Sequence, residues 1–441
     1  ALIMFGSLLV LLMAGLPLAF VTGGLACVFL FVLGDARALN IVPSRIFPLM
    51  TNYQLSAIPL FIFMAAMLER AGIINDMFDV IYKVLGGVKG GLAAATIIAS
   101  TILAAMVGVI GAAVVTMGII ALPAMLKRHY DPKIAMGSIM AGGTLGILIP
   151  PSILAIIYAV VAEQSVGELF IGAVIPGLLL SGMYIAYVVL RCYINPVLGP
   201  AIPVDERVSN AEKLRLVGKM AAPITLVVVV LGIIFSGVAT PVEAAGIGTF
   251  GAFIVAAIHR KLDWPTVREA CTTTLKASAM VIWIMFGATI FVGLYVLEGG
   301  QQFVQDALAA TGLGPWGILI LMQVLLVILG MFLDWVGILL LCVPIFVPII
   351  KVLGAQAFGL ESPEDLVLWF GVLYLVNMQM SFLSPPFGYA LFYLRGVAPP
   401  EIPMTDIFKS ALPFLALQIV GLTLCMVFPE IITWLPRLVY G

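Results

Sequence analysis

Two apolar stretches of the chain are interrupted by paired prolines with small or polar residues beside them. The first reads GGTLGILIPPS from Gly142 to Ser152, and the second reads MSFLSPPFG from Met380 to Gly388. Each proline removes a backbone N–H donor and disfavours a helical conformation of the residue before it, so a helix must open at both places. Opening frees main-chain carbonyls, which are the hard oxygen ligands that alkali cations prefer. A helix that restarts after the prolines presents its positive dipole end to a carboxylate.

The side chains around these breaks predict a joint site for a cation and an organic anion. The residues expected to bind the anion flank the two proline pairs: Thr144, Pro150, Pro151, Ser152, Asn377, Ser384, Pro385 and Pro386. Gln379 and Ser381 supply further polar atoms before the second pair. The alternative is a proline kink whose freed groups are satisfied by neighbouring helices, and two such motifs make that alternative weaker than one would.

Asp334 is the only acid deep within an apolar stretch, ILGMFLDWVGILLLCV. An unpaired charge there costs about 2.5 to 3.5 kcal/mol or more, so we expect a functional residue. It is predicted to bind sodium or to hold a tip loop by accepting N–H bonds. A buried acid that stays protonated, or that is paired for structure, is the alternative. The corresponding stretch of the first half, Val107 to Gly111, has no side-chain oxygen, so an ion there must rely on main-chain carbonyls.

The composition indicates the class of protein that positions these residues. Of 441 residues, 63% are hydrophobic and only 10% are charged, which excludes a soluble domain with about 25% charged residues. The net charge of −1 leaves no basic surplus for nucleic acid. We find no phosphate-binding glycine loop, no metal-spaced His/Cys set and no nucleophile–base pair, which disfavours an ATP-driven pump and an enzyme. No organic cofactor is expected.

The apolar segments predict an all-α, polytopic membrane protein. Spans of sufficient or nearly sufficient length occur at about 2–14, 17–33, 54–70, 170–190, 221–237, 243–258, 270–297 and 410–428. The first residues are thus expected to span already. Residues 92–126 and 316–350 are apolar but interrupted in the middle, and are predicted to be re-entrant hairpins. Residues 134–162 and 366–395 are predicted to be spans broken at the proline pairs. Non-helical backbone at membrane depth is tolerated where it lines a cavity.

Basic residues set the orientation of these spans. With the N-terminus outside, four basic residues face outward, namely Arg37, Arg45, Lys351 and Arg437, and the remaining 17 of the 21 face inward. This asymmetry agrees with the positive-inside rule. Both termini are therefore predicted to be periplasmic.

Glycines and prolines recur along the chain with an offset of about 226 residues. Gly86, Gly91 and Gly111 pair with Gly312, Gly317 and Gly337, and the proline pairs recur after a longer loop with an offset of 235. Each half then contains five crossings, an odd number, so the halves must enter from opposite faces as inverted repeats. The predicted units are 1–191, an amphipathic linker at 192–220, and 221–441. Amphipathic helices are expected near 74–85, 301–310 and 209–219.

The stretch ALPAMLKRHYDPKIAMGSIMAGGTLGILIPPSI, followed by FLDWVGILLLCVPIFVPIIKVLG and NMQMSFLSPPFG, resembles the large membrane subunit of TRAP (tripartite ATP-independent periplasmic) transporters. The resemblance runs from the first residues to about 428. It implies a sodium-coupled elevator in the bacterial inner membrane. It also implies two partners, a small four-helix membrane subunit and a periplasmic substrate-binding protein that delivers an organic acid.

The resemblance also implies two sodium sites, each formed by a hairpin tip and the adjacent broken helix. Carried over, the first falls at Val107, Gly108, Gly111, Gly143, Thr144 and Gly146, and the second at Phe332, Asp334, Gly337, Gln379, Ser381 and Ser384. Many members carry serines at the first tip and a glycine in place of Ser381. Compared with its own first half, the second half of the chain also has about ten extra residues between Lys351 and Leu366, AQAFGLESPED and neighbours, which are predicted to face outward towards the binding protein.

The function expected on these grounds is sodium-coupled, binding-protein-dependent import of a small organic acid by an elevator movement. The alternatives are an organic-anion channel, or a sodium/carboxylate symporter that works without a binding protein. Uptake without sodium dependence would indicate the channel. An intramembrane enzyme would require a nucleophile and base that we do not find.

Overall fold

The computed structural model describes residues 2–107, 110–203, 207–331, 333–386 and 388–441, which form helices joined by turns and loops and contain no strand. The helices are α1 (Leu2–Met13), α2 (Leu18–Ala38), α3 (Ile41–Met50), α4 (Ala57–Arg70), α5 (Ile73–Leu85), α6 (Gly91–Val107), α7 (Ile110–Lys127), α8 (Pro132–Thr144), α9 (Ile153–Ala162), α10 (Val166–Ile194), α11 (Asn210–Lys219), α12 (Ala221–Phe235), α13 (Pro241–Ile258), α14 (Trp264–Leu297), α15 (Gly300–Ala310), α16 (Pro315–Gly330), α17 (Trp335–Leu353), α18 (Pro363–Leu383), α19 (Tyr389–Arg395), α20 (Met404–Val427) and α21 (Glu430–Tyr440). The predicted all-α class is confirmed.

Among the described helices, seven are long and apolar enough to cross a membrane: α7, α10, α13, α14, α17, α18 and α20. An eighth span results if α3 is joined to η1 (Tyr53–Ser56) and α4, from which it is bent by 59°. The chain is therefore a multi-pass membrane protein.

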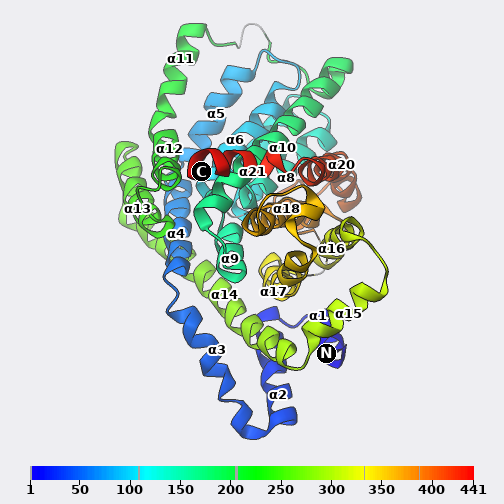
Figure 1. Ribbon diagram of the computed structural model, residues 1–441. Helices are drawn as coiled ribbons and strands as arrows, with labels where there is room; N and C mark the ends of the chain where they lie inside the picture. The colour runs from blue at the N-terminus through cyan, green and yellow to red at the C-terminus, as the bar shows by residue number, and fades with distance from the viewer. Residues whose placement is uncertain (1, 108–109, 204–206, 332, 387) are drawn as a thin grey trace.

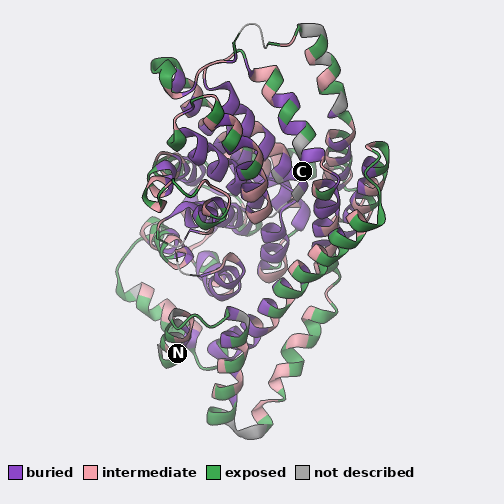
Figure 2. Cartoon of the chain, turned by 180° about the vertical axis from the view of Figure 1, so that it is seen from behind, coloured by how far each residue is buried: buried purple, intermediate pink, exposed green. Residues whose placement is uncertain are grey.

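The helices form two groups. The frame helices, α1–α4 and α12–α14, contact one another through α13 on α4 and through α14 on α2 and α4. The core helices, α6–α10 and α16–α20, pack around α8 and α18. The apolar window of α18 is 100% buried inside the protein. Figure 2 shows buried residues gathered in the core helices, while α2 and α3 remain largely exposed or half-buried.

The first predicted hairpin consists of α6 and α7, which pack against each other. Its two ends lie together, because the backbone N–H of Leu92 at the start of α6 donates to the Tyr130 hydroxyl, just after α7, at 3.2 Å. Burial of this phenol raises the pKa of Tyr130 to about 12, so the hydroxyl stays protonated at neutral pH. Residues 92–126 therefore start and finish at the same end of the molecule.

The second predicted hairpin, α16 and α17, also returns to its starting point. Trp316, at the start of α16, packs its ring 5.4 Å from the ring of Phe358, which follows α17. Phe358 in turn lies 5.2 Å from the Trp369 ring of α18. Phe358 belongs to the extra residues of the second half and is buried, so this insert is anchored to the core helices. The predicted contact of this insert with a binding protein stays a prediction. Another residue of the insert, Glu361, has a side chain that is 80% exposed.

The open ends of the two hairpins, where their arms begin and finish, lie at opposite ends of α10. Near its C-terminus, Cys192 touches the Gly90 and Gly199 region beside the first hairpin. Near its N-terminus, Glu168 shares a surface pocket with Glu361 and Arg437, beside the second hairpin. The 29 residues of α10 span roughly 43 Å at about 1.5 Å per residue. The hairpins thus enter the core from opposite ends of this helix.

The two halves of the chain also exchange contacts. Each hairpin packs on the broken helix of its own half, α6 and α7 on α8, and α16 and α17 on α18. The short segment after each break crosses to the other half, because α9 contacts α17 and α19 contacts α7. The long helix that follows each of these short segments also contacts the broken helix of the other half: α20 contacts α8, and α10 contacts α18. These paired contacts fit the predicted repeat of the halves.

The predicted amphipathic helices are present as α5, α15 and α11, and Figure 1 places α11 at the end of the molecule opposite α2 and α3. Asp76, Asp79 and Lys83 are exposed on α5, while Phe78 is buried. Two helices have no counterpart in the sequence-based prediction. These are α3, whose sequence IVPSRIFPLM contains two prolines, and the C-terminal α21.

Candidate functional site

The first broken helix opens where the sequence predicts. Helix α8 ends at Thr144, a short 3-10 turn covers Leu145–Ile147, and Pro150–Pro151 is a cis peptide. The chain resumes as α9 with Ser152 as its N-cap. The Ser152 hydroxyl donates to the Ile147 carbonyl at 2.5 Å and accepts from the Ala155 N–H at 3.3 Å. Ser152 therefore joins the two sides of the break and satisfies a free N–H of the new helix.

The first hairpin packs tightly around this break. Helices α6 and α7 both contact the turn that follows Thr144. A Cβ on Gly142 would overlap Ser100 of α6, and one on Gly143 would overlap Val114 of α7, so glycine is needed for this approach.

Three residues of the first predicted sodium set, Gly143, Thr144 and Gly146, lie at this junction. Gly143 and Thr144 end α8, Gly146 is in the turn, Val107 ends α6 and Gly111 lies in the first turn of α7. Gly108 lies outside the described residues.

The second broken helix opens at Ser384. Its hydroxyl donates to the Met380 carbonyl at 2.7 Å, Pro385–Pro386 is a second cis peptide, and α19 begins at Tyr389. Pro385 is half-buried and Pro386 is exposed. The last residue of α16, Gly330, faces Ser381 so closely that a Cβ would overlap the serine side chain. Through Gly330, the second hairpin thus packs directly against the polar segment of α18 that precedes the break.

Asp334 caps the second arm of this hairpin. Its Oδ2 accepts from the Val336 N–H at 3.2 Å at the start of α17. This is the loop-holding interaction expected from the sequence as one of its roles. The same side chain is only half-buried and lines a cavity. Phe332 lies outside the described residues, and Gly337 packs against Leu18 of α2 on the frame side.

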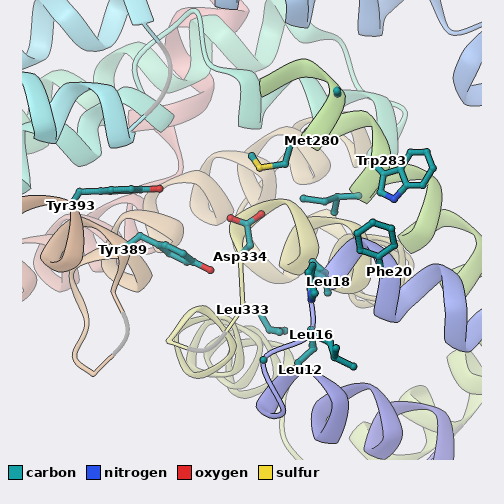
Figure 3. Close-up of a pocket in the computed structure, with 14 residues that line it drawn as sticks. Leu12, Leu16, Leu18, Phe20, Met280, Trp283, Leu333, Asp334, Tyr389 and Tyr393 are labelled. Atoms are coloured by element: carbon teal, nitrogen blue, oxygen red, sulfur yellow. The ribbon is translucent and has the colours of Figure 1, made fainter. Parts of the chain in front are cut away.

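The cavity beside Asp334 has a volume of about 740 Å³ and lies between the frame and core helices. Figure 3 shows Asp334, Tyr389 and Tyr393 on the core side, facing Phe20, Met280 and Trp283 of the frame. The Tyr393 ring also lies against Gly111 of the first hairpin. The first turn of α7 and the capped start of α17 therefore both border α19.

The cavity carries an acid without a compensating base. Among its described lining residues, Asp334 is the only carboxylic acid, and none is Lys, Arg or His. An organic anion placed near Asp334 would be repelled unless a cation neutralised the carboxylate. The surrounding indole, phenol and thioether groups offer an apolar wall with two hydroxyl groups.

A fully buried polar cluster joins the two broken helices. The Thr144 hydroxyl lies 3.4 Å from Gln379 Oε1, and Gln418 Nε2 of α20 donates to the same hydroxyl at 3.4 Å. The Tyr184 hydroxyl of α10 lies beside Gln418 and Thr144. The predicted first and second sodium sets are thereby brought into contact through Thr144 and Gln379.

Asn377 forms a second buried amide pair. Its Nδ2 donates to Gln323 Oε1 at 2.7 Å and to the Gln323 carbonyl at 2.9 Å, which ties α18 to α16. Its predicted role in anion binding stays a prediction, as do the roles of Thr144, Ser152, Ser384 and the two proline pairs. None of these residues is among those that line the cavity beside Asp334. In the described chain, no hydrogen bond joins Asp334 to Gln379, Ser381 or Ser384.

Sequence reasoning missed four residues of this region: Tyr184, Gln323, Gln418 and Gly330. Gln323 and Gln418 are polar residues inside apolar helices, PWGILILMQVLLVILG and MTDIFKSALPFLALQIVGLTLCMV. Such residues usually face the interior of a bundle, so this signal was available in the sequence. The need for glycine at 330 depends on Ser381, which is distant in sequence, and gave no local signal.

Comparison with known proteins shows that the chain is similar to membrane subunits of transporters. The model of the family "Tripartite ATP-independent periplasmic transporter, DctM component" matches residues 5–431. The C4-dicarboxylate TRAP transporter large permease protein of Pseudomonas aeruginosa is 32% identical over 417 residues, covering 94% of this chain and 92% of that protein. The sialic acid TRAP transporter large permease protein of Vibrio cholerae is 30% identical, covering 98% and 97%.

One solved structure shares the fold at low sequence identity. The Alcanivorax borkumensis YdaH transporter superimposes with a TM-score of 0.67 at 16% identity, covering 98% of this chain and 99% of that one.

Proposed function

The chain belongs to the DctM component family of tripartite ATP-independent periplasmic transporters, and on this premise we propose that it imports a small organic acid with sodium as the coupling ion. It is a large permease subunit and not an enzyme. The observation that carries the proposal is the cavity between the frame and core helices. It holds Asp334 and, among its described lining residues, no cationic side chain.

Sodium coupling follows from the charges in this cavity. A carboxylate substrate and the Asp334 carboxylate repel each other in a site of low dielectric. A sodium ion bound at Asp334 would remove that repulsion, and a second ion at the main-chain carbonyls around Thr144 would add positive charge within the core helices. Two or more sodium ions are proposed for this reason. Substrate then binds well only after sodium, which is the requirement for symport.

The movement we propose is an elevator. The hairpins and broken helices pack mainly on one another, and the frame helices pack mainly on one another. The core helices are thus able to shift as a unit against the frame, carrying the cavity from one membrane face to the other. The ions would order the hairpin tips, so that only the empty or fully loaded core moves. The inverted arrangement of the halves supplies two equivalent end states.

The substrate is proposed to be a carboxylate because the relatives named above carry C4-dicarboxylates and sialic acid. The proposed partners are a small four-helix membrane subunit and a periplasmic substrate-binding protein. The location is the bacterial inner membrane, with both termini periplasmic. The choice of acid is expected to lie mainly with the binding protein.

The test is uptake by liposomes that contain the chain with its small subunit. Radiolabelled succinate and N-acetylneuraminate serve as probes, with the binding protein present or absent outside. We expect uptake of one organic acid only with the binding protein and an inward sodium gradient, and at least a tenfold loss when choline replaces sodium. Uptake that is equal without sodium would indicate a channel. Uptake that needs sodium but no binding protein would indicate the independent symporter.

A further inference from the structure

The contact between Thr144 and Gln379 joins equivalent positions of the two halves. The proline pairs at 150–151 and 385–386 are 235 residues apart, and so are Thr144 and Gln379. Tyr184 and Gln418, which complete the cluster, are 234 residues apart. Two residues related by a repeat touch each other only where the halves meet at the axis that relates them. The buried cluster therefore occupies the axis of the predicted repeat, between the two broken helices.

The hydrogen bonding of this cluster is incomplete. Thr144, Gln379, Gln418 and Tyr184 are each 0% exposed. The single hydroxyl hydrogen of Thr144 has two acceptors, the Ala141 carbonyl at 2.8 Å and Gln379 Oε1 at 3.4 Å. Within the described chain, Gln379 Nε2 and Gln418 Oε1 have no partner. The Tyr184 hydroxyl also has no partner there, so the cluster holds both unpaired donors and unpaired acceptors. Such a cluster has alternative pairings of similar free energy, and a small shift of one helix changes the pairing.

We infer that this cluster couples the two cation sites: Thr144 and Gln379 form the joint between them, and Gln418 and Tyr184 are its positioning residues. The inference rests on the proposed function, because it requires two sodium sites. Thr144 lies beside Gly143 and Gly146 of the first set, and Gln379 lies two residues before Ser381 of the second. Ion binding at one break would favour one pairing of Thr144, and Gln379 carries that change to the other break. A two-state element biased by both sites is what coupling requires.

Gln418 is the residue to test because it belongs to neither predicted sodium set. Gln418→Met keeps the volume and removes the amide that donates to Thr144. Coupling of about 5- to 150-fold between two sites gives a Hill coefficient of about 1.4 to 1.85. We expect the wild type in this range and Gln418→Met near 1, with the overall sodium midpoint changed less than the steepness. Tyr184→Phe removes one hydroxyl and is expected to lower the coefficient in the same direction.

The measurement is sodium titration of the full chain, purified with its small subunit, in the absence of substrate. Sodium chloride replaces choline chloride at constant ionic strength, and the fluorescence of Trp335, next to Asp334, reports binding; the other tryptophans are replaced by Phe in every variant. The matched control is Ser410→Ala. It removes a buried hydroxyl from the same helix α20 that only bonds the Ile407 carbonyl, so its Hill coefficient should match the wild type.

The outcomes separate this inference from the proposed function. A wild type that does not respond to sodium contradicts the proposed function itself. A wild type with a Hill coefficient of 1, or a Gln418→Met protein that keeps the wild-type coefficient, would contradict the coupling of the two cation sites through this cluster. Sodium-driven transport would not be contradicted by either result. If Gln418→Met does not fold, Tyr184→Phe decides: unchanged steepness in that variant overturns the joint.

Discussion

Asp334→Asn is expected to abolish sodium-driven uptake in a protein that remains folded. Asparagine is as good an N-cap as aspartate, so the capping of α17 by this residue survives. Only the charge is lost. A carboxylate and a cation about 4 Å apart attract each other by about 4 kcal/mol at an effective dielectric constant of about 20, which corresponds to about a thousandfold in sodium affinity. Uptake at ordinary sodium concentrations should then be below detection.

Asp334→Ala separates the two roles of the residue. It removes both the charge and the cap seen at Val336, and the lost cap costs about 0.5 to 2 kcal/mol of stability. We expect both variants to be inactive and the alanine variant alone to unfold at lower temperature. Uptake into liposomes and thermal unfolding in detergent check this. Asp306→Asn, an exposed acid of α15, is the matched control and should behave as wild type. Near-normal uptake by Asp334→Asn would show that the residue is only a cap.

Gly330→Ala is expected to reduce uptake at least tenfold. The added Cβ would overlap the Ser381 side chain, and both residues are buried where the second hairpin seats on α18. Overpacking of this kind costs typically about 1 to 3 kcal/mol, which here displaces the hairpin from the broken helix. Because the overlap involves only the serine Cβ and Oγ at close range, the double variant Gly330→Ala with Ser381→Gly should recover most of the uptake.

This pair tests the seating of the hairpin directly. Uptake and protein stability are measured for the single and the double variant in the same liposomes. Gly232→Ala serves as the control, because a Cβ at this position of α12 meets nothing within 4 Å. Failure of Ser381→Gly to rescue Gly330→Ala, with the double variant folded, would mean that the contact does not set the position of the hairpin.

Much of the architecture was predictable because glycines and prolines mark the places where its helices break or turn. The proline pairs located both broken helices, and the interrupted apolar stretches located both hairpins. Helix α3 has no counterpart among the predicted elements. Its Pro43 lies in the first turn, where a proline removes only an N–H that has no partner, while Pro48 lies inside the helix. Helix α21 was missed because the last apolar segment had been read as ending at 428.

The site was less predictable than the fold for two physical reasons. Main-chain carbonyls carry no compositional signal, so the first predicted cation site rests on backbone geometry around Gly143 and Gly146. The buried cluster depends on residues that are far apart in the chain: Thr144 and Gln418 are separated by 274 positions. Asp334 was predictable because a lone acid in an apolar stretch is costly. Its role as a cap and its place at the cavity wall both follow from the described contacts.

Labelling of two single cysteines tests the central claim, that the halves are inverted and their hairpins enter from opposite faces. His129→Cys lies after the first hairpin and Glu361→Cys after the second, and both native side chains are exposed. The background carries Cys271→Ser and Cys27→Ser, because the other three cysteines are buried. In right-side-out vesicles, an impermeant maleimide is expected to label position 361 only, and in inside-out vesicles position 129 only. Labelling of both positions from the same side would contradict the account.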